Sequence, residues 1–131
     1  MHLLTFLRHD KAEPGVLVDD GQIVSLSGIA ADMIALIGNW EALADNVGAL
    51  AQQGERIALD SVRLLAPVPR PGKIFAIGLN YADHVEEAGM ETPPHQIWFT
   101  KAATAVNGPF DPIEIPRGSF TTDYEVEMVA V

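Results

Sequence analysis

Two glutamates near the end of the sequence have a spacing that suits a metal ion. Glu125 and Glu127 stand in Thr122-Asp-Tyr-Glu-Val-Glu-Met-Val-Ala-Val131, and the pattern predicts a strand over residues 123–131. In a strand both carboxylates share one face about 7 Å apart, so they repel one another unless a cation neutralises them. Carboxylate oxygens suit Mg²⁺, Mn²⁺ or Ca²⁺. A solvated acidic face explains the pattern equally well, and two ligands are too few for a stable site.

A histidine and a glutamate three residues apart have the spacing of a general base and its partner. His84 and Glu87 stand in a predicted helix over residues 80–89 and therefore share one side of it. A carboxylate beside an imidazole fixes its tautomer and raises its basicity, which is how a base that activates water is built. A solvent-exposed pair on a helix surface is the commoner reason for this spacing.

A lysine closes the apolar run Ile97-Trp-Phe-Thr-Lys101, which predicts a strand. Lys101 marks the point where this strand meets water, or it supplies a cation that receives a substrate carboxylate. The residues alone leave both interpretations open. The remaining histidines, His2, His9 and His95, are predicted to lie on the surface.

The strands and helices predicted before residue 67 indicate a small α+β domain. Strands are predicted over residues 2–8 and 15–26, with Asp20-Gly21 as a hairpin signal. Ser27 predicts the N-cap of a helix. A second helix is predicted from Trp40 to about Gln53. The first helix would bury Ile29, Met33, Ile34 and Ile37, and the second would bury Leu43, Val47 and Leu50 before ending at Gly54.

A proline-rich connector separates this domain from the candidate chemistry. Pro67, Pro69 and Pro71 cannot join a sheet ladder or a helix interior, so residues 67–72 are predicted to be extended. We therefore expect a small accessory domain over residues 1–66. Residues 73–131 would begin a second, catalytic domain.

Composition excludes several classes of function. The formal net charge is −10 and only eight residues are Lys or Arg, which argues against a nucleic-acid partner. The chain has no cysteine, so any metal must be held by oxygen or imidazole ligands. No apolar run is long enough for a signal peptide or a bilayer span, so we expect a cytoplasmic protein without a membrane partner.

The order of these features resembles the fumarylacetoacetate hydrolase family. The likeness covers residues 73–131 with nearly continuous spacing. The sequence motifs Pro116-Arg-Gly-Ser and Asp123-Tyr-Glu-Val-Glu are most similar to those of members named as 2,4-diketo-3-deoxy sugar-acid hydrolases or ureidoglycolate lyases. The segments that carry it are Lys73-Ile-Phe-Ala-Ile-Gly-Leu-Asn-Tyr-Ala-Asp-His-Val-Glu-Glu, Ile97-Trp-Phe-Thr-Lys-Ala-Ala-Thr-Ala, Gly108-Pro, Ile115-Pro-Arg-Gly-Ser and Asp123-Tyr-Glu-Val-Glu.

The resemblance implies a catalytic domain of mixed β-roll architecture, homodimeric in the full-length protein, that binds Mg²⁺ or Mn²⁺, or Ca²⁺ in some members. It implies C–C bond hydrolysis of a small acylpyruvate or 2,4-diketo acid. Isomerase or decarboxylase chemistry on 2-hydroxy-dienedioates is the alternative on the same fold. By the family's motif, Glu125 and Glu127 are metal ligands, His84 is the base and Glu87 its partner, and Asn80, Tyr81 and Lys101 contact substrate.

Two departures from the family pattern qualify these expectations. Leu79 stands where some members have arginine, so recognition of an anionic substrate is open. The family's third metal carboxylate would lie beyond Val131. We therefore expect activity only in a complete catalytic domain, and a non-catalytic fragment is the remaining alternative.

Overall fold

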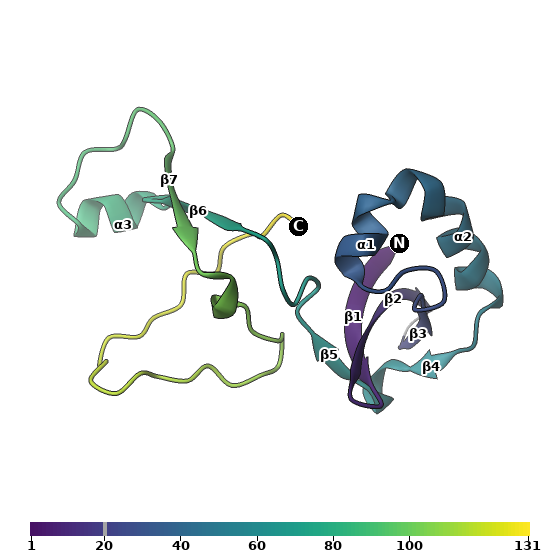
Figure 1. The fold of residues 1–131 in the computed structure, drawn as a ribbon. Coiled ribbons are helices and arrows are strands. Elements are labelled where there is room, and N and C mark those ends of the chain that lie inside the picture. Colours follow the sequence, from purple (N-terminus) through teal and green to yellow (C-terminus); the bar gives the residue numbers. More distant parts are fainter. Residues whose placement is uncertain (20) are drawn as a thin grey trace. The chain divides into compact units, whose positions relative to one another are not determined.

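In the computed structural model, which describes residues 1–19 and 21–131, the first three strands form two successive hairpins (Figure 1). β1 (His2–Arg8) pairs with β2 (Lys11–Asp19), and Arg8 lies opposite Lys11. The two residues between them, His9 and Asp10, have φ of 49° and 59°. Positive φ at both central positions is the geometry of a type I′ turn, whose twist matches that of the flanking strands.

The predicted hairpin after β2 is confirmed. β3 (Gln22–Ser25) pairs antiparallel with β2, and Asp19 lies opposite Gln22. Asp20, one half of the predicted turn signal, lies outside the described residues. The strand before this turn begins at Lys11 rather than at Gly15, because the pairing with β1 extends along its whole length.

Two short strands complete a five-stranded antiparallel sheet. β4 (Ile57–Ala58) pairs with β3, and β5 (Arg63–Leu65) pairs with β1 after a single 3-10 turn, η1 (Leu59–Ser61). The strand order is β4-β3-β2-β1-β5.

The first helix begins later than the sequence predicted. α1 (Met33–Gly38) is capped by Asp32, whose Oδ1 accepts a hydrogen bond from the Ala35 amide at 2.8 Å. The prediction of Ser27 as the cap was wrong, because the helix begins six residues beyond it. The Ser27 hydroxyl lies 2.9 Å from that of Ser25 instead. The predicted buried face is confirmed in part: Met33 is buried and Ile29 packs against the core. Ile34 and Ile37 are exposed, and Leu36 is buried instead.

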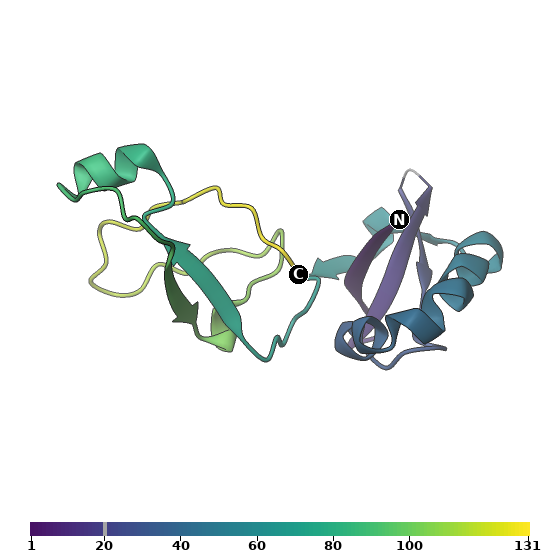
Figure 2. The same cartoon turned by 90° about the horizontal axis from the view of Figure 1, so that it is seen from above.

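The second helix is confirmed with its predicted bounds. α2 (Trp40–Gln53) ends at Gly54, whose amide donates to the Leu50 carbonyl at 2.7 Å. Both helices pack on one face of the sheet (Figure 2). The core between them consists of Val16, Val24, Leu26, Ala30, Met33, Leu36 and Val47, with Leu43 and Leu50 packed against it.

The chain forms two compact units. One comprises Met1–Pro69 with Asn107–Val131, and the other comprises Arg70–Val106. In the second unit β6 (Ile74–Gly78) and β7 (Ile97–Lys101) pair antiparallel as a two-stranded ribbon. α3 (Ala82–Glu87) lies between them in the sequence, and η2 (Ala103–Ala105) follows them.

The prediction of a strand over residues 123–131 was wrong. Residues 121–131 form neither helix nor strand, and a strand requires a neighbour to satisfy its backbone hydrogen bonds. None of the described strands pairs with this segment. Val126 has a φ of 49°, which breaks the regular alternation of side chains. The apolar residues of segment 121–131 are exposed and do not enter a core: the exposed fraction is 79% for Val129 and 77% for Val131.

The helices of the described residues are α1, α2 and α3. None is both long enough and apolar enough to cross a bilayer.

Candidate functional site

Four of the predicted site residues lie at or within α3. β6 ends at Gly78, and Leu79 turns the chain with a φ of 55° before the helix starts. Asn80 and Tyr81 follow this turn, and Tyr81 is the N-cap residue, with extended backbone and no side-chain capping bond. The Tyr81 side chain is partly exposed, so the sequence places a polar, accessible turn at the entrance to the helix.

His84 and Glu87 occupy one side of α3, as their spacing predicted. Both residues are exposed. No hydrogen bond or ion pair joins their side chains among the contacts of the described residues. The His84 backbone amide donates to Asp83 Oδ1 at 3.0 Å. In the part of the chain that the structure describes, no carboxylate contact that fixes the orientation of this imidazole is seen.

Lys101 lies at the far end of the ribbon from this turn. Its backbone is opposite Ile74, whereas Gly78 is opposite Ile97. Four residues of strand separate the two ends, which corresponds to about 13 Å. The Lys101 Nζ lies 5.7 Å from the ring centroid of Phe99, so the ammonium is directed back along the ribbon.

Phe99 was not among the predicted site residues. Residues two apart in a strand share a face, so the spacing of Phe99 and Lys101 could have predicted that the two side chains lie side by side. A cation over an exposed aromatic ring contributes about 0.5–1 kcal/mol. The Phe99 ring therefore favours one orientation of the Lys101 ammonium.

The acidic residues lie in the other unit. Glu125 and Glu127 belong to Asn107–Val131, which clusters with the N-terminal sheet, whereas His84 and Lys101 belong to Arg70–Val106. Both glutamates are exposed. Because Val126 between them has positive φ, strand alternation does not place their carboxylates on one face. The seven predicted site residues are therefore distributed over two units.

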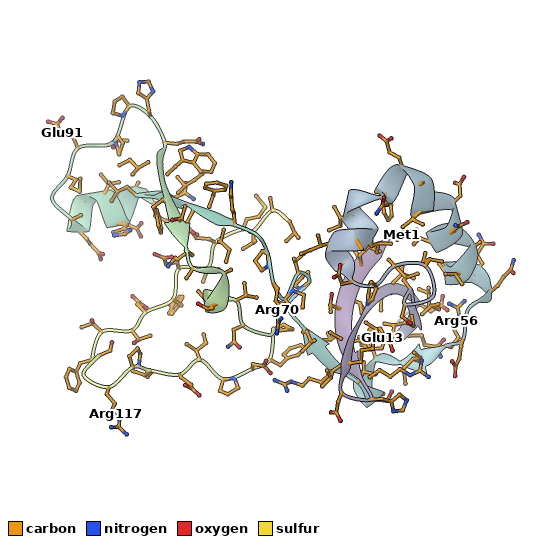
Figure 3. The ribbon with its side chains drawn as sticks, viewed as in Figure 1. Met1, Glu13, Arg56, Arg70, Glu91 and Arg117 are labelled. Carbon is orange, nitrogen blue, oxygen red and sulfur yellow. The ribbon has the colours of Figure 1, made fainter. Side chains whose placement is uncertain are left out.

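The donor chemistry of the two glutamates fits a hard divalent cation, but the number of ligands does not complete a site. Within residues 1–19 and 21–131, no group of three or more His, Cys, Asp or Glu side chains is placed to hold a metal ion. Other acidic side chains, such as Glu91 on the loop after α3, point away from the chain (Figure 3).

Comparison with known families assigns both parts of the sequence. The family described as fumarylacetoacetate (FAA) hydrolase C-terminal matches residues 73–131. The family described as Rv2993c-like, N-terminal, matches residues 1–67.

Curated relatives match all or most of the chain. A protein of Burkholderia ambifaria, whose name assigns it provisionally to the hydrolases, is 39% identical over 131 residues. The match covers all of this chain and 46% of that protein, so the chain spans less than half the length of such relatives. The mitochondrial oxaloacetate tautomerase of Rattus norvegicus is 45% identical over 83 residues, which are 63% of this chain and 26% of the tautomerase.

Solved structures share the fold. Maleylpyruvate hydrolase from Sphingobium, crystallised with manganese(II) and pyruvate, superposes with a TM-score of 0.70 at 30% identity, over 89% of this chain and 43% of that one. A protein from Mycobacterium smegmatis superposes with a TM-score of 0.68 at 27% identity, over 90% and 42% of the two chains. The chain belongs to the fumarylacetoacetate hydrolase family, and its first 67 residues form the Rv2993c-like N-terminal domain.

Proposed function

We propose that the protein to which this chain belongs is a metal-dependent hydrolase that cleaves a C–C bond in a small acylpyruvate or 2,4-diketo acid. The observation that carries this proposal is the likeness to maleylpyruvate hydrolase, whose crystals contain manganese(II) and pyruvate. Pyruvate is the fragment that such a cleavage would release from an acylpyruvate. Family membership supports a hydrolase in general terms, and the substrate is our inference.

Each candidate residue has a proposed role. Glu125 and Glu127 would supply two carboxylates to a Mg²⁺ or Mn²⁺ ion, or to Ca²⁺. When bound, that ion would supply Lewis-acid stabilisation of negative charge on the substrate oxygens. His84 would accept a proton from water, and Glu87 would orient its imidazole.

The remaining roles concern the substrate. Lys101 would receive its carboxylate as a cation with a flexible stem. Asn80 and Tyr81, both exposed at the start of α3, would line the substrate pocket of the complete catalytic domain. These roles require side chains from both compact units, so we expect them to operate only in a complete catalytic domain.

The organisation of the whole protein is part of the same proposal. We propose an accessory domain over residues 1–66, a connector over residues 67–72, and the start of a catalytic domain over residues 73–131. We also propose a cytoplasmic homodimer in full-length form, acting on a small keto acid without nucleic-acid or membrane partners. Analytical ultracentrifugation of the full-length protein tests the dimer directly.

Isothermal titration with Mn²⁺ and Mg²⁺ tests the metal ligands in the full-length protein. The double substitution Glu125→Gln with Glu127→Gln should abolish measurable binding, because it removes two anionic ligands and keeps their size. The matched control neutralises two other exposed acidic residues, Glu91→Gln with Glu114→Gln, and should bind as the parent does. Unchanged affinity after the first double substitution would rule out the assignment.

Substitution of the proposed base tests the second role. His84→Ala should lower kcat by roughly 10²–10⁴-fold, the usual range for loss of a general base. His95→Ala removes another exposed imidazole and serves as the control. Parent-level turnover by His84→Ala on every substrate tested contradicts water activation by this residue.

A second candidate function is keto–enol tautomerisation or a related isomerase or decarboxylase reaction. The 45% identity to oxaloacetate tautomerase over 83 residues favours it. Product analysis separates these reactions, because hydrolysis yields two carboxylic acids, decarboxylation releases CO₂, and tautomerisation or isomerisation preserves the mass of the substrate. Acylpyruvates, 2-hydroxy-dienedioates and oxaloacetate should be assayed in parallel. Absence of turnover with all three classes would favour a non-catalytic role.

A further inference from the structure

A short loop beyond η2 contacts the N-terminal sheet through one ion pair. The Arg63 guanidinium, on β5, donates to Asp111 Oδ1 from both Nη2 at 2.8 Å and Nε at 3.2 Å. The two residues are 48 positions apart in the sequence. The Asp111 side chain is only 22% exposed, so the pair is partly shielded from water.

The loop is also closed on itself. The Asn107 carboxamide donates to the carbonyl oxygens of Asp111 at 3.4 Å and Pro112 at 3.0 Å. Its own oxygen accepts from the Gly108 amide at 3.0 Å. The Asp111 amide donates to the Gly108 carbonyl at 3.3 Å, which closes the turn. One side chain thus holds both ends of residues 107–112, which we call the strap.

The strap lines a concave surface together with residues of the N-terminal sheet and η1. Phe110 and Asp111 line an open pocket together with residues of η1 and β5. Its other lining residues include Leu59, Val62 and Leu64. Both members of the ion pair therefore line a depression and do not lie on a flat surface.

We propose that the strap is a docking element, and that Arg63 holds it and the segment after it on the N-terminal sheet. The chain leaves this unit after Pro69 and returns at Asn107. Ordering the returning segment costs conformational entropy, and the described segment 107–131 has no helix or strand to offset it. The contact between Arg63 and Asp111 is the ion pair that joins the segment to β5. It defines a role for the N-terminal domain, namely positioning the chain that carries the acidic residues.

Hydrogen–deuterium exchange of the full chain tests this proposal without an activity assay. Asp111→Asn keeps the shape of the side chain and removes its charge. Exchange of the amides in residues 107–112 should accelerate roughly two- to fivefold, as expected for an ion pair of this exposure. Arg63→Gln should give the same change, and the double variant should add little to either single variant. The reversed pair, Arg63→Asp with Asp111→Arg, should recover part of the protection.

Two matched controls separate docking from a general effect of charge. Glu114→Gln removes a carboxylate three residues beyond Asp111. Arg117→Gln removes a guanidinium that extends away from the chain (Figure 3). Both should leave exchange in the strap unchanged, and exchange in β1 reports whether each variant is folded. If exchange in the strap is the same in Asp111→Asn, Arg63→Gln and the parent while β1 stays protected, the strap is not held by Arg63 and the proposal fails.

Discussion

The N-terminal residues 1–69 and the ribbon with α3 in residues 70–106 bury their apolar side chains to very different extents. In the first region Phe6, Val16, Leu26 and Leu36 are 0–1% exposed. In the second, among the described residues, Val85 is the only buried hydrophobic side chain. Each fully buried Val, Leu or Phe contributes about 1.5–3 kcal/mol. The N-terminal domain can therefore stabilise its own fold, while the ribbon has little core of its own.

The aromatic residues of the ribbon sharpen this contrast. Phe75 is 60% exposed and Trp98 is 59% exposed, and they meet edge to face with ring centroids 6.3 Å apart. A two-stranded ribbon is marginally stable alone. Packing and chemistry are thus divided between the regions: the tightly packed one carries no predicted site residue, and the open one carries five of the seven.

The largest expected effect compares two phenylalanines. Phe6→Ala removes a fully buried ring and should lower the free energy of unfolding by about 3–5 kcal/mol. Phe75→Ala removes a mostly exposed ring and should cost about 1 kcal/mol or less. Urea unfolding followed by circular dichroism measures both. Equal costs would break the comparison, because they would mean that the ribbon has a core comparable to that of the N-terminal domain.

Two glycines of the helical layer test how tightly the N-terminal core is packed. A Cβ at Gly54 would clash with Val24 Cγ1 and would lie 2.7 Å from the Leu50 carbonyl oxygen. Gly54→Ala should therefore lower the free energy of unfolding by about 1–3 kcal/mol. Gly48→Ala meets nothing within 4 Å and should raise it by up to about 1 kcal/mol. Thermal unfolding distinguishes them, and a stabilising Gly54→Ala would show that the contact relaxes freely.

The start of α1 gives a smaller effect. Asp32→Ala removes the side chain that caps the helix and should cost about 0.5–2 kcal/mol. Ser27→Ala changes the residue that the sequence pattern favoured and should stay within about 0.5 kcal/mol. The comparison is made by chemical denaturation. The reverse order of costs would restore Ser27 as the cap.

The smallest expected effect concerns the end of the N-terminal domain. The buried Thr5 hydroxyl donates to the Pro67 carbonyl at 2.6 Å, which ties the start of the connector to β1. Thr5→Val removes this donor and should cost about 0.5–1.5 kcal/mol, whereas Thr5→Ser retains it. Differential scanning calorimetry measures the difference. Equal melting temperatures for the two variants would show that the hydrogen bond contributes nothing.

Local signals predicted most of the elements. α2 has an apolar stripe at helical spacing and a glycine at its end, and both its bounds were predicted. β7 is a run of β-formers closed by a lysine, and its bounds were predicted as well. The type I′ turn at His9 and Asp10 was missed because neither residue is glycine or asparagine, so the sequence carried no strong turn signal.

The predictions failed where the structure depends on a choice between two capping residues, on a partner strand or on a contact between residues far apart in the sequence. Ser27 and Asp32 are both good capping residues, but residues 27–32 are not helical, so Asp32 is the one that stands directly before the first helical turn. Residues 123–131 alternate like a strand, but alternation does not supply a partner strand. The link between Arg63 and Asp111 could not be predicted, because 48 residues separate them and each looks like an ordinary surface charge.

The lengths of the outermost strands in the five-stranded sheet have a consequence for association with other chains. β4 has two residues and β5 has three, whereas β1 and β2, with seven and nine, lie inside the sheet. An edge strand displays unpaired N–H and C=O groups on which a foreign strand can align, and a very short edge displays few of them. The N-terminal sheet thus gives a misfolded or nascent chain almost no template for aggregation.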